Sequence, residues 1–255
     1  VSGTVKKIDT VLMPNGTKAQ AIVIDTDGEQ TVDPAIQPPV VNSKEEFIEA
    51  VKQSGLVGLG GAGFPAHIKL NPKDKIEYLC INAAECEPIL GHNISRIITD
   101  AEKIIRGIEY VKEIVGAKDV QIAIKHKHTN AVALLEEAIR GHKDISLELM
   151  KNRYPEGEER AIIRDSNLHK LLKTTDLPYA ANAIVTNVET VFRVAEAIED
   201  RKPVMTKDIT VGGRLNGDNE TVVVRKDVPL GMLVKDILAA YPDMADYGEL
   251  IMGGP

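Results

Sequence analysis

The sequence is poor in aromatic residues and in cysteine. It contains no tryptophan, three phenylalanines and two cysteines among 255 residues. The cysteines, Cys80 and Cys86, have the spacing C-x5-C, which matches neither a zinc knuckle nor an iron–sulfur run. We therefore expect no metal site within these residues, and two lone thiols are typical of a reducing compartment. Cys80 lies in an apolar run and is expected in the core, whereas Cys86 lies in a polar segment where it could touch a ligand.

The sequence also lacks a long hydrophobic run and an excess of positive charge. No stretch approaches the length of a spanning helix, and the first residues do not form a signal peptide. We expect a cytoplasmic protein without direct membrane insertion, which could still be peripheral to a membrane complex. The net charge is -7, with acids and bases interspersed, which argues against nucleic-acid binding. The basic run 125–128 is interpreted as a solvated loop.

Turn residues and hydrophobic periodicity predict several structural elements. Residues 1–35 contain short β-type runs separated by turn residues, and a linker with three prolines follows. A capping box, Ser43-x-x-Glu46, then predicts a helix that stops near Gly55. Farther on, strands alternate with helices, which predicts right-handed βαβ units and a parallel sheet. The expected strands are 76–82, 120–125, 145–150 and 183–188, and the expected helices are 94–115, 130–140 and 189–200. After residue 208, strands at 208–213, 221–225 and 249–252 and a helix over 229–240 suit a small α+β unit.

Four glycines within six residues mark the segment GLGGAGFPAHIKL, 58–70. It is not a dinucleotide fingerprint, which follows a strand, nor a P-loop, which ends in Gly-Lys-Ser/Thr. Such a run still offers free N–H groups that could bind a phosphate, and Lys69 could add positive charge. The alternative is a tight turn packed against a helix.

The stretch NAAECEP, 82–88, directly follows a predicted strand. Ligands of open α/β sheets bind beyond the carboxyl ends of strands, so Asn82, Glu85 and Glu87 could line a pocket. The two carboxylates could form an acid/base pair, a metal pair or a solvated loop.

Two further stretches carry polar side chains that could serve a ligand. YPEGEER, 154–160, contains three glutamates, and TNVET, 186–190, lies at a predicted strand-to-helix junction. Asn187 and Thr190 could offer amide and hydroxyl groups to a ligand near the start of that helix, which favours an anion. Alternatively, they only cap the helix.

Taken together and in this order, GLGGAGFPAHIK, YLCINAAECEP, YPEGEERAII and IVTNVET resemble the flavin-binding core of the RnfC subunit of Rnf electron-transport complexes. More loosely, they resemble the flavoprotein subunit of respiratory NADH dehydrogenase. Soluble members of the family include the electron-transfer protein associated with proline reductase and the cobalamin reductase of propanediol utilisation. The resemblance is strong over residues 40–200 and extends to both ends.

The resemblance implies an α/β fold with a Rossmann-like parallel-sheet core that binds FMN, over residues 41–205. Residues 1–40 would be a partial barrel-sandwich β unit and linker, with an upstream segment expected before it. Residues 206–255 would be a β-grasp (SLBB) domain. A cysteine-rich segment that binds [4Fe-4S] clusters would follow residue 255.

The resemblance also implies a function. NADH would deliver a hydride to FMN, and electrons would then pass singly to iron–sulfur centres outside this segment and to electron-transfer partner proteins. The alternative is a flavin-free scaffold or ligand-binding module, which grips a partner or cobalamin through its β-grasp domain.

The resemblance assigns roles to particular residues. The glycine loop would lie against the flavin, the carboxylates Glu87 and Glu159 would be the catalytic residues at the nicotinamide opening, and their influence would be electrostatic. The implied cofactor-binding residues are Gly60, Gly61, Ala62, Gly63, Phe64, Lys69, Asn82, Glu85, Tyr154, Gly157, Glu158, Thr186, Asn187 and Thr190.

The sequence departs from the respiratory subunit at several positions. Leu59 replaces an arginine, Ala84 replaces an aspartate that hydrogen-bonds the flavin ring, and Thr186 replaces the first asparagine of a pair. Residues 174–183 contain neither lysine nor phenylalanine, so the surface that clamps NADH in the respiratory subunit is not visible in this sequence.

Overall fold

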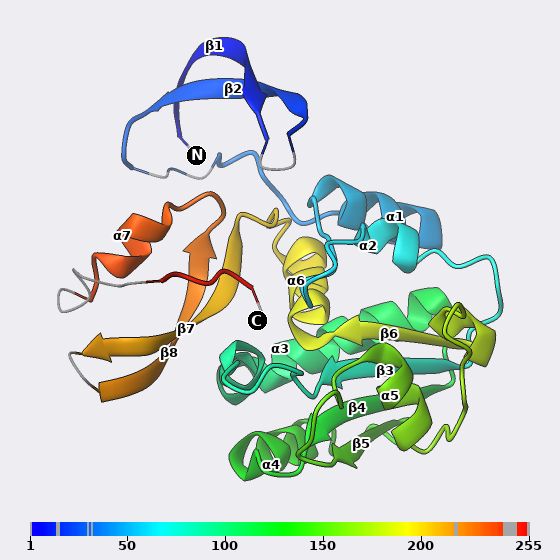
Figure 1. Ribbon diagram of the computed structural model, residues 1–255. Helices are drawn as coiled ribbons and strands as arrows, with labels where there is room; N and C mark the ends of the chain where they lie inside the picture. Colours follow the sequence, from blue (N-terminus) through cyan, green and yellow to red (C-terminus); the bar gives the residue numbers. More distant parts are fainter. Residues whose placement is uncertain are drawn as a thin grey trace. The chain divides into compact units, whose positions relative to one another are not determined.

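The computed structural model describes residues 2–13, 16–29, 31, 33–216, 219–241 and 249–253 (Figure 1). The chain divides into two compact units, Val1–Gln37 and Pro38–Pro255. In the first unit, strand β1 (Gly3–Leu12) pairs antiparallel with β2 (Lys18–Thr26), and most residues of both strands are exposed. This hairpin accounts for the β-type runs of the sequence, while the barrel-sandwich domain stays a prediction.

A parallel sheet of four strands forms the centre of the second unit. Its strands are β3 (Tyr78–Ala83), β4 (Asp119–Lys125), β5 (Ile145–Met150) and β6 (Ala183–Asn187), in the spatial order β5-β4-β3-β6. All three pairings are parallel, which confirms the predicted sheet. The chain runs from β3 outward to β4 and β5 and then returns to add β6 on the other side of β3. The β3–β6 pair is therefore the topological switch point, where open α/β sheets bind their ligands.

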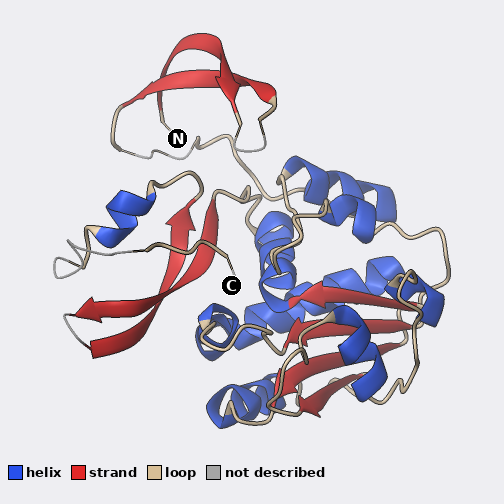
Figure 2. Cartoon of the chain, in the orientation of Figure 1, coloured by secondary structure: helices blue, strands red, loops and turns tan. Residues whose placement is uncertain are grey.

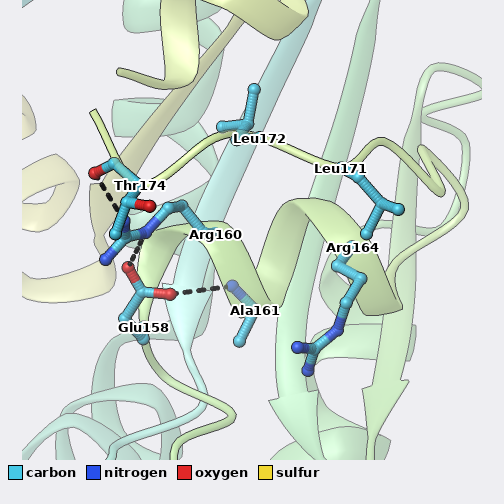
Figure 3. Close-up of a pocket in the computed structure, with 7 residues that line it drawn as sticks. All are labelled: Glu158, Arg160, Ala161, Arg164, Leu171, Leu172 and Thr174. Atoms are coloured by element: carbon cyan, nitrogen blue, oxygen red, sulfur yellow. Dashed lines mark hydrogen bonds and ion pairs between the residues drawn. The ribbon is translucent and has the colours of Figure 1, made fainter. Parts of the chain in front are cut away.

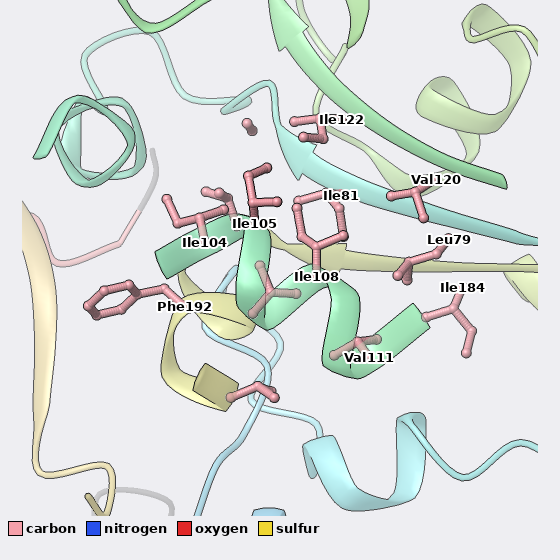
Figure 4. Packing of buried hydrophobic residues seen from close by; sticks show 14 of the residues in the cluster. Leu79, Ile81, Ile104, Ile105, Ile108, Val111, Val120, Ile122, Ile184 and Phe192 are labelled. Atoms are coloured by element: carbon pink, nitrogen blue, oxygen red, sulfur yellow. The ribbon is translucent and has the colours of Figure 1, made fainter. Parts of the chain in front are cut away.

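Helices cover both faces of this sheet (Figure 2). The first face packs against α3 (His92–Val115), α4 (Thr129–Ala138) and α6 (Val188–Glu199), which contribute to the larger hydrophobic core. Figure 4 shows Ile104, Ile108 and Val111 of α3 in this core. Their spacing is the helical spacing from which the sequence predicts this helix. The second face packs against α5 (Glu159–Asp165) and the 3-10 helix Pro178–Ala181. Neither of these short helices was expected from the sequence.

Two helices flank the glycine loop. Helix α1 (Lys44–Gln53) begins at the predicted capping box, where Ser43 Oγ accepts a hydrogen bond of 3.2 Å from the Glu46 N–H. The Glu46 carboxylate accepts at 2.7 Å from the N–H of Asn42, one residue before the position that a capping box predicts. Helix α2 (Ala66–Lys69) follows the glycine loop directly, so Lys69 lies on a single helical turn.

A long hairpin of β7 (Thr206–Asn216) and β8 (Asn219–Pro229) follows the core, and then helix α7 (Val234–Leu238). The hairpin belongs to the same compact unit as the sheet and contacts α3. The helix expected over 229–240 is shorter than predicted. The strand expected at 249–252 is wrong, because residues 249–253 form no strand. A β-grasp domain therefore stays a prediction.

Gly107 brings α3 and α6 into close contact. A Cβ atom at this position would overlap the backbone carbonyl of Val191 and would lie 3.5 Å from the Cβ of Ala195. Because the overlap is with backbone, a side-chain rotation cannot relieve it, and the two helices must move apart.

We expect Gly107→Ala to lower the free energy of unfolding by about 1–3 kcal/mol, although alanine has the higher helix propensity. Urea denaturation measures the change. The control is Glu113→Ala at an exposed position of α3, which should alter stability by less than about 0.5 kcal/mol. Equal stability of the Gly107→Ala variant and the parent protein would contradict the described crossing of α3 and α6.

Candidate functional site

The carboxyl ends of β3 and β6 bring two of the sequence motifs together. Asn82 on β3 pairs with Asn187 on β6, and Ile81 pairs with Thr186. Parallel strands end at the same edge of a sheet, so NAAECEP and TNVET begin side by side there. The predicted location of the site at a strand end therefore corresponds to the switch point of the sheet.

The glycine loop is both a tight turn and a source of free backbone donors. An antiparallel bridge joins Val57 to Pro65, and the Gly58 N–H donates to the Phe64 carbonyl at 2.7 Å. Gly61 and Gly63 have φ angles of 120° and 63°, in the region that side chains disfavour. The N–H groups of Gly60, Gly61 and Ala62 find no hydrogen-bond partner among the residues that the structure describes.

The glycine loop lies against the beginning of α6. The Leu59 N–H donates to Thr190 Oγ1 at 3.0 Å, and a Cβ atom at Gly60 would approach the Asn187 Cβ to 3.2 Å. Asn187 also caps α6, since its side-chain oxygen accepts from the Glu189 N–H at 2.9 Å. Asn187 therefore caps α6, which is the alternative that the sequence left open, and Thr190 holds the glycine loop. A side chain at position 60 would crowd Asn187. The roles of both residues toward a cofactor stay predictions.

The YPEGEER segment reaches the same edge of the sheet through Asn82. Its side-chain amide donates to the Gly157 carbonyl at 2.8 Å, and its oxygen accepts from the Ala84 N–H at 3.1 Å. A Cβ atom at Gly157 would lie 2.7 Å from the sulfur of Cys86. Glycine at position 157 is thus required by packing between the two segments.

An ion pair closes the arrangement. Lys69 Nζ, at the end of the glycine segment, lies 2.8 Å from Oε1 of Glu159 at the start of α5. The Tyr179 hydroxyl donates to the Lys69 carbonyl at 3.1 Å and fixes the same turn from another side. The four motifs therefore form a closed circuit of contacts: glycine loop to α6, β6 to β3, β3 to Gly157, and Glu159 back to Lys69.

Glu85 is the most buried carboxylate of the NAAECEP segment. It is 7% exposed and has a positive φ of 38°. Its Oε1 accepts from the Asn93 N–H in the first turn of α3 at 2.8 Å, while its Oε2 is buried with no partner among the described residues. Burial raises the pKa of Glu85, and hydrogen bonds from the α3 backbone oppose the rise. A positive φ at a non-glycine residue is typical of functional segments.

Lys125 contradicts the interpretation of residues 125–128 as a solvated loop. It is 5% exposed, and its Nζ donates to the Glu85 carbonyl at 2.7 Å. The sequence signal was its position as the last residue of the apolar strand VQIAIK, which places it at the carboxyl edge of the sheet. Lys125 is therefore a site residue that sequence reasoning missed.

The remaining predicted residues differ in how exposed they are to solvent. Phe64 is 49% exposed and Tyr154 is 71% exposed, while Glu87 is half-buried. Thr186 is buried at the end of β6. Their roles toward a cofactor stay predictions. Cys80 is fully buried, as predicted, and burial raises its pKa to about 12.

Glu158 belongs mainly to a different feature, a pocket of about 310 Å³ between α5 and residues 171–174 (Figure 3). Its carboxylate caps α5 by accepting from the Ala161 N–H at 3.0 Å and pairs with Arg160 at 2.9 Å. Arg160 in turn donates to the Thr174 carbonyl at 2.8 Å. The residues that line the pocket are Glu158, Arg160, Ala161, Arg164, Leu171, Leu172 and Thr174. Apart from Glu158, none of them is a predicted cofactor-binding residue.

The circuit fits the flavin that the sequence resemblance implies. At Gly61 and Gly63 an added Cβ atom would meet nothing within 4 Å, so the loop borders open space. The loop's three N–H groups that have no partner in the described part of the chain can donate to carbonyl or phosphate oxygens. Within the described residues, no group of three His, Cys, Asp or Glu side chains is arranged to hold a metal ion. In the same residues, no helix is long and apolar enough to cross a membrane.

Curated relatives match most of the chain. A component of the Na⁺-translocating ferredoxin:NAD⁺ oxidoreductase complex of Acetobacterium woodii is 29% identical over 262 residues, which cover 100% of this chain and 58% of the relative. Cobalamin reductase PduS of Salmonella typhimurium is 34% identical over 218 residues, which cover 84% of this chain and 45% of the relative. The chain thus spans about half the length of the curated relatives it matches.

A solved structure and a family model agree with these matches. The NAD⁺-reducing [NiFe]-hydrogenase in its H₂-reduced state superposes with a TM-score of 0.63 at 21% identity, covering 78% of this chain and 39% of that one, which shows a shared fold. The model of the Nuo51 FMN-binding domain matches residues 51–196, which include all four motifs of the circuit. The predicted resemblance to RnfC-type proteins is confirmed. The chain belongs to the family of the Nuo51 FMN-binding domain.

Proposed function

We propose that this chain is the FMN-holding part of an NADH-linked electron-transfer protein, whose iron–sulfur acceptors lie outside this segment. The observation that carries the proposal is the closed circuit of contacts at the switch point, whose glycine loop has three backbone donors without a partner among the described residues. When bound, FMN supplies the exchange between two-electron and one-electron transfer. The protein has to bind, orient and shield it.

The glycine loop and the start of α6 are the parts of the chain suited to hold a phosphate-bearing cofactor. The N–H groups of Gly60, Gly61 and Ala62 can donate to it, and no hydrogen bond to another described residue has to break first. Thr190 keeps the loop in place, because its hydroxyl oxygen accepts from the Leu59 N–H at 3.0 Å. Thr190 thus acts on the cofactor through the loop.

Charged groups near Asn82 set the polarity on the other side of the circuit. Glu85 is held between α3 and Lys125, so its position is fixed whether or not its carboxyl is ionised. Lys125 Nζ orients the Glu85 carbonyl and brings a buried positive charge to the sheet edge, which favours a ligand that gains electrons.

The family resemblance assigns Phe64 and Glu87 to the side where a nicotinamide would approach. Phe64 is 49% exposed and could stack on a ring, and Glu87 is half-buried. Negative charge at Glu87 repels the dinucleotide phosphates and favours approach by the uncharged end of the donor, so its effect is on orientation. Glu159 is engaged with Lys69, which assigns it to holding the circuit together.

The first prediction tests the glycine-loop anchor. Thr190→Val keeps the side-chain volume but leaves the Leu59 N–H without its acceptor, so the FMN dissociation constant should rise roughly tenfold. Quenching of flavin fluorescence measures this binding. The control is Thr174→Val in the pocket beside α5, which should bind FMN as the parent does. A weaker affinity for Thr174→Val alone would place the cofactor in that pocket and contradict the proposal.

The second prediction concerns the electron donor. In FMN-loaded protein, Glu87→Gln should lower the limiting rate of flavin bleaching by NADH roughly tenfold through misorientation, with FMN retained. Anaerobic stopped flow measures the rate. Glu77→Gln, before the amino end of β3, changes the net charge equally and should leave the rate unchanged. If a reduced ferredoxin bleaches the flavin of the parent protein but NADH never does, the proposed hydride transfer from NADH is wrong and the flavin only relays single electrons.

The third prediction follows from the raised pKa of Glu85. Folded protein binds the Glu85 proton more tightly than unfolded protein, so this group's contribution to stability falls as the pH rises above its ordinary pKa of 4.5. The stability of Glu85→Gln relative to the parent should therefore increase between pH 4.5 and pH 7. Urea denaturation of both flavin-free proteins across this range measures the difference. A difference that is constant with pH would show that burial does not raise this pKa.

A further inference from the structure

We propose that Thr210, on strand β7 of the hairpin, is a positioning residue for the loop 86–91 and hence for the flavin site. The inference rests on the proposed function for its effect on FMN, while the position of the loop itself can be tested without flavin. This loop carries Cys86 and Glu87 and joins Glu85 to helix α3.

The Thr210 hydroxyl holds the junction between the loop and α3. Its oxygen accepts from the Gly91 N–H at 3.1 Å, and it lies 3.2 Å from Nδ1 of His92, the first residue of α3. The next residue, Asn93, donates its N–H to the Glu85 carboxylate at 2.8 Å. The hydroxyl therefore holds the end of the loop at Gly91. The start of the loop, at Glu85, is held two residues farther along, by the N–H of Asn93.

The direction of the hydrogen bond between His92 and Thr210 depends on which ring nitrogen carries the proton. Burial, the largest cause, and the positive charge of Lys207 together lower the pKa of His92 to about 4, against the opposing effect of Asp208. At neutral pH the ring carries one proton. With that proton on Nε2, Nδ1 accepts from the Thr210 O–H, and with it on Nδ1, the ring donates to the Thr210 oxygen, which also accepts from the Gly91 N–H. In either tautomer the hydroxyl contacts both Gly91 and His92.

The hairpin also packs directly against the loop. A Cβ atom at Gly212 would come within 2.7 Å of Ile89 Cδ1, and a Cβ atom at Gly91 would lie 3.4 Å from Val224 Cγ2. These approaches come from both strands of the hairpin, β7 and β8. The loop is therefore bounded by the hairpin on this side and by Gly157 at Cys86.

A buried ionic cluster fixes the hairpin to the core. Arg96 of α3 makes two hydrogen bonds to Asp208, at 2.7 and 2.6 Å, and its guanidinium lies 4.4 Å from the centre of the Phe192 ring. Arg193 of α6 donates to Asp227 at 3.0 Å. Asp208 follows Lys207, whose ammonium contacts Glu189. Because a buried charge that loses its partner is costly, this cluster gives Thr210 one defined place relative to α3.

The consequence is a connection between the C-terminal hairpin and the flavin site. Any displacement of β7 moves the support of the loop that carries Glu87, although no residue of the hairpin belongs to the predicted cofactor set. Thr210 makes its contribution to this connection through hydrogen bonds, so it can be altered without removing a charge.

The experiment uses the full 255-residue chain and measures alkylation of its two cysteines by iodoacetamide, resolved by mass spectrometry. Cys86 reports on the loop, and Cys80, which is fully buried, reports on global unfolding. Thr210→Val should raise the alkylation rate of Cys86 at least about threefold and leave that of Cys80 unchanged. Thr210→Ser restores the hydroxyl and should restore the rate. Thr221→Val on the same hairpin removes a hydroxyl that has no partner among the described residues, and should have no effect.

The FMN dissociation constant is then measured for the same variants and should rise by a similar factor in Thr210→Val alone. An unchanged Cys86 rate, or a parallel increase for Cys80, would overturn the positioning role. Faster Cys86 alkylation with unchanged FMN affinity would overturn the link to the flavin site. If the parent protein binds no FMN, the proposed function fails, and the alkylation rates still decide whether Thr210 holds the loop.

Discussion

The parallel pairing of β3 with β6 is the constraint on which the site depends. It places Asn82 beside Asn187 at the switch point of the sheet, although the two residues are far apart in the sequence. Asn82 then holds Gly157, and Asn187 supports Gly60. The strand pairing brings these two contacts to the same edge of the sheet. The glycine loop thus gains its place from the strand order, and the ion pair of Lys69 with Glu159 closes an arrangement that the sheet has already set.

Most helices and strands of the core can be predicted from the sequence, because the spacing of apolar residues in a long segment indicates which of its faces is buried. The spacing of Ile104, Ile108 and Val111 predicts α3, and the apolar run around Cys80 predicts β3. Both signals arise from residues whose environment is determined mainly by their own element. The motifs were found for a different reason, since the family resemblance gave the order of four stretches that separately had ordinary structural explanations.

The remainder could not be predicted because it depends on tertiary contacts. Helix α5 has seven residues, too few for a periodic pattern, and its start is capped by Glu158. Lys125 ends the predicted strand 120–125, but its charge favours exposure, and its burial is explained by the contact with the Glu85 carbonyl. Thr210 lies 119 positions from Gly91, and no local pattern indicates that its hydroxyl would support the loop there. These residues are where tertiary structure overrides local preference.

Amide hydrogen exchange of the protein with and without FMN tests the central claim most directly, because it locates the cofactor without altering a residue. The account predicts that FMN slows exchange at Gly60, Gly61 and Ala62, whose N–H groups lack protein partners among the described residues, and in the segments around Asn82 and Asn187. Protection confined to the pocket between α5 and residues 171–174, or no protection at saturating FMN, would contradict it.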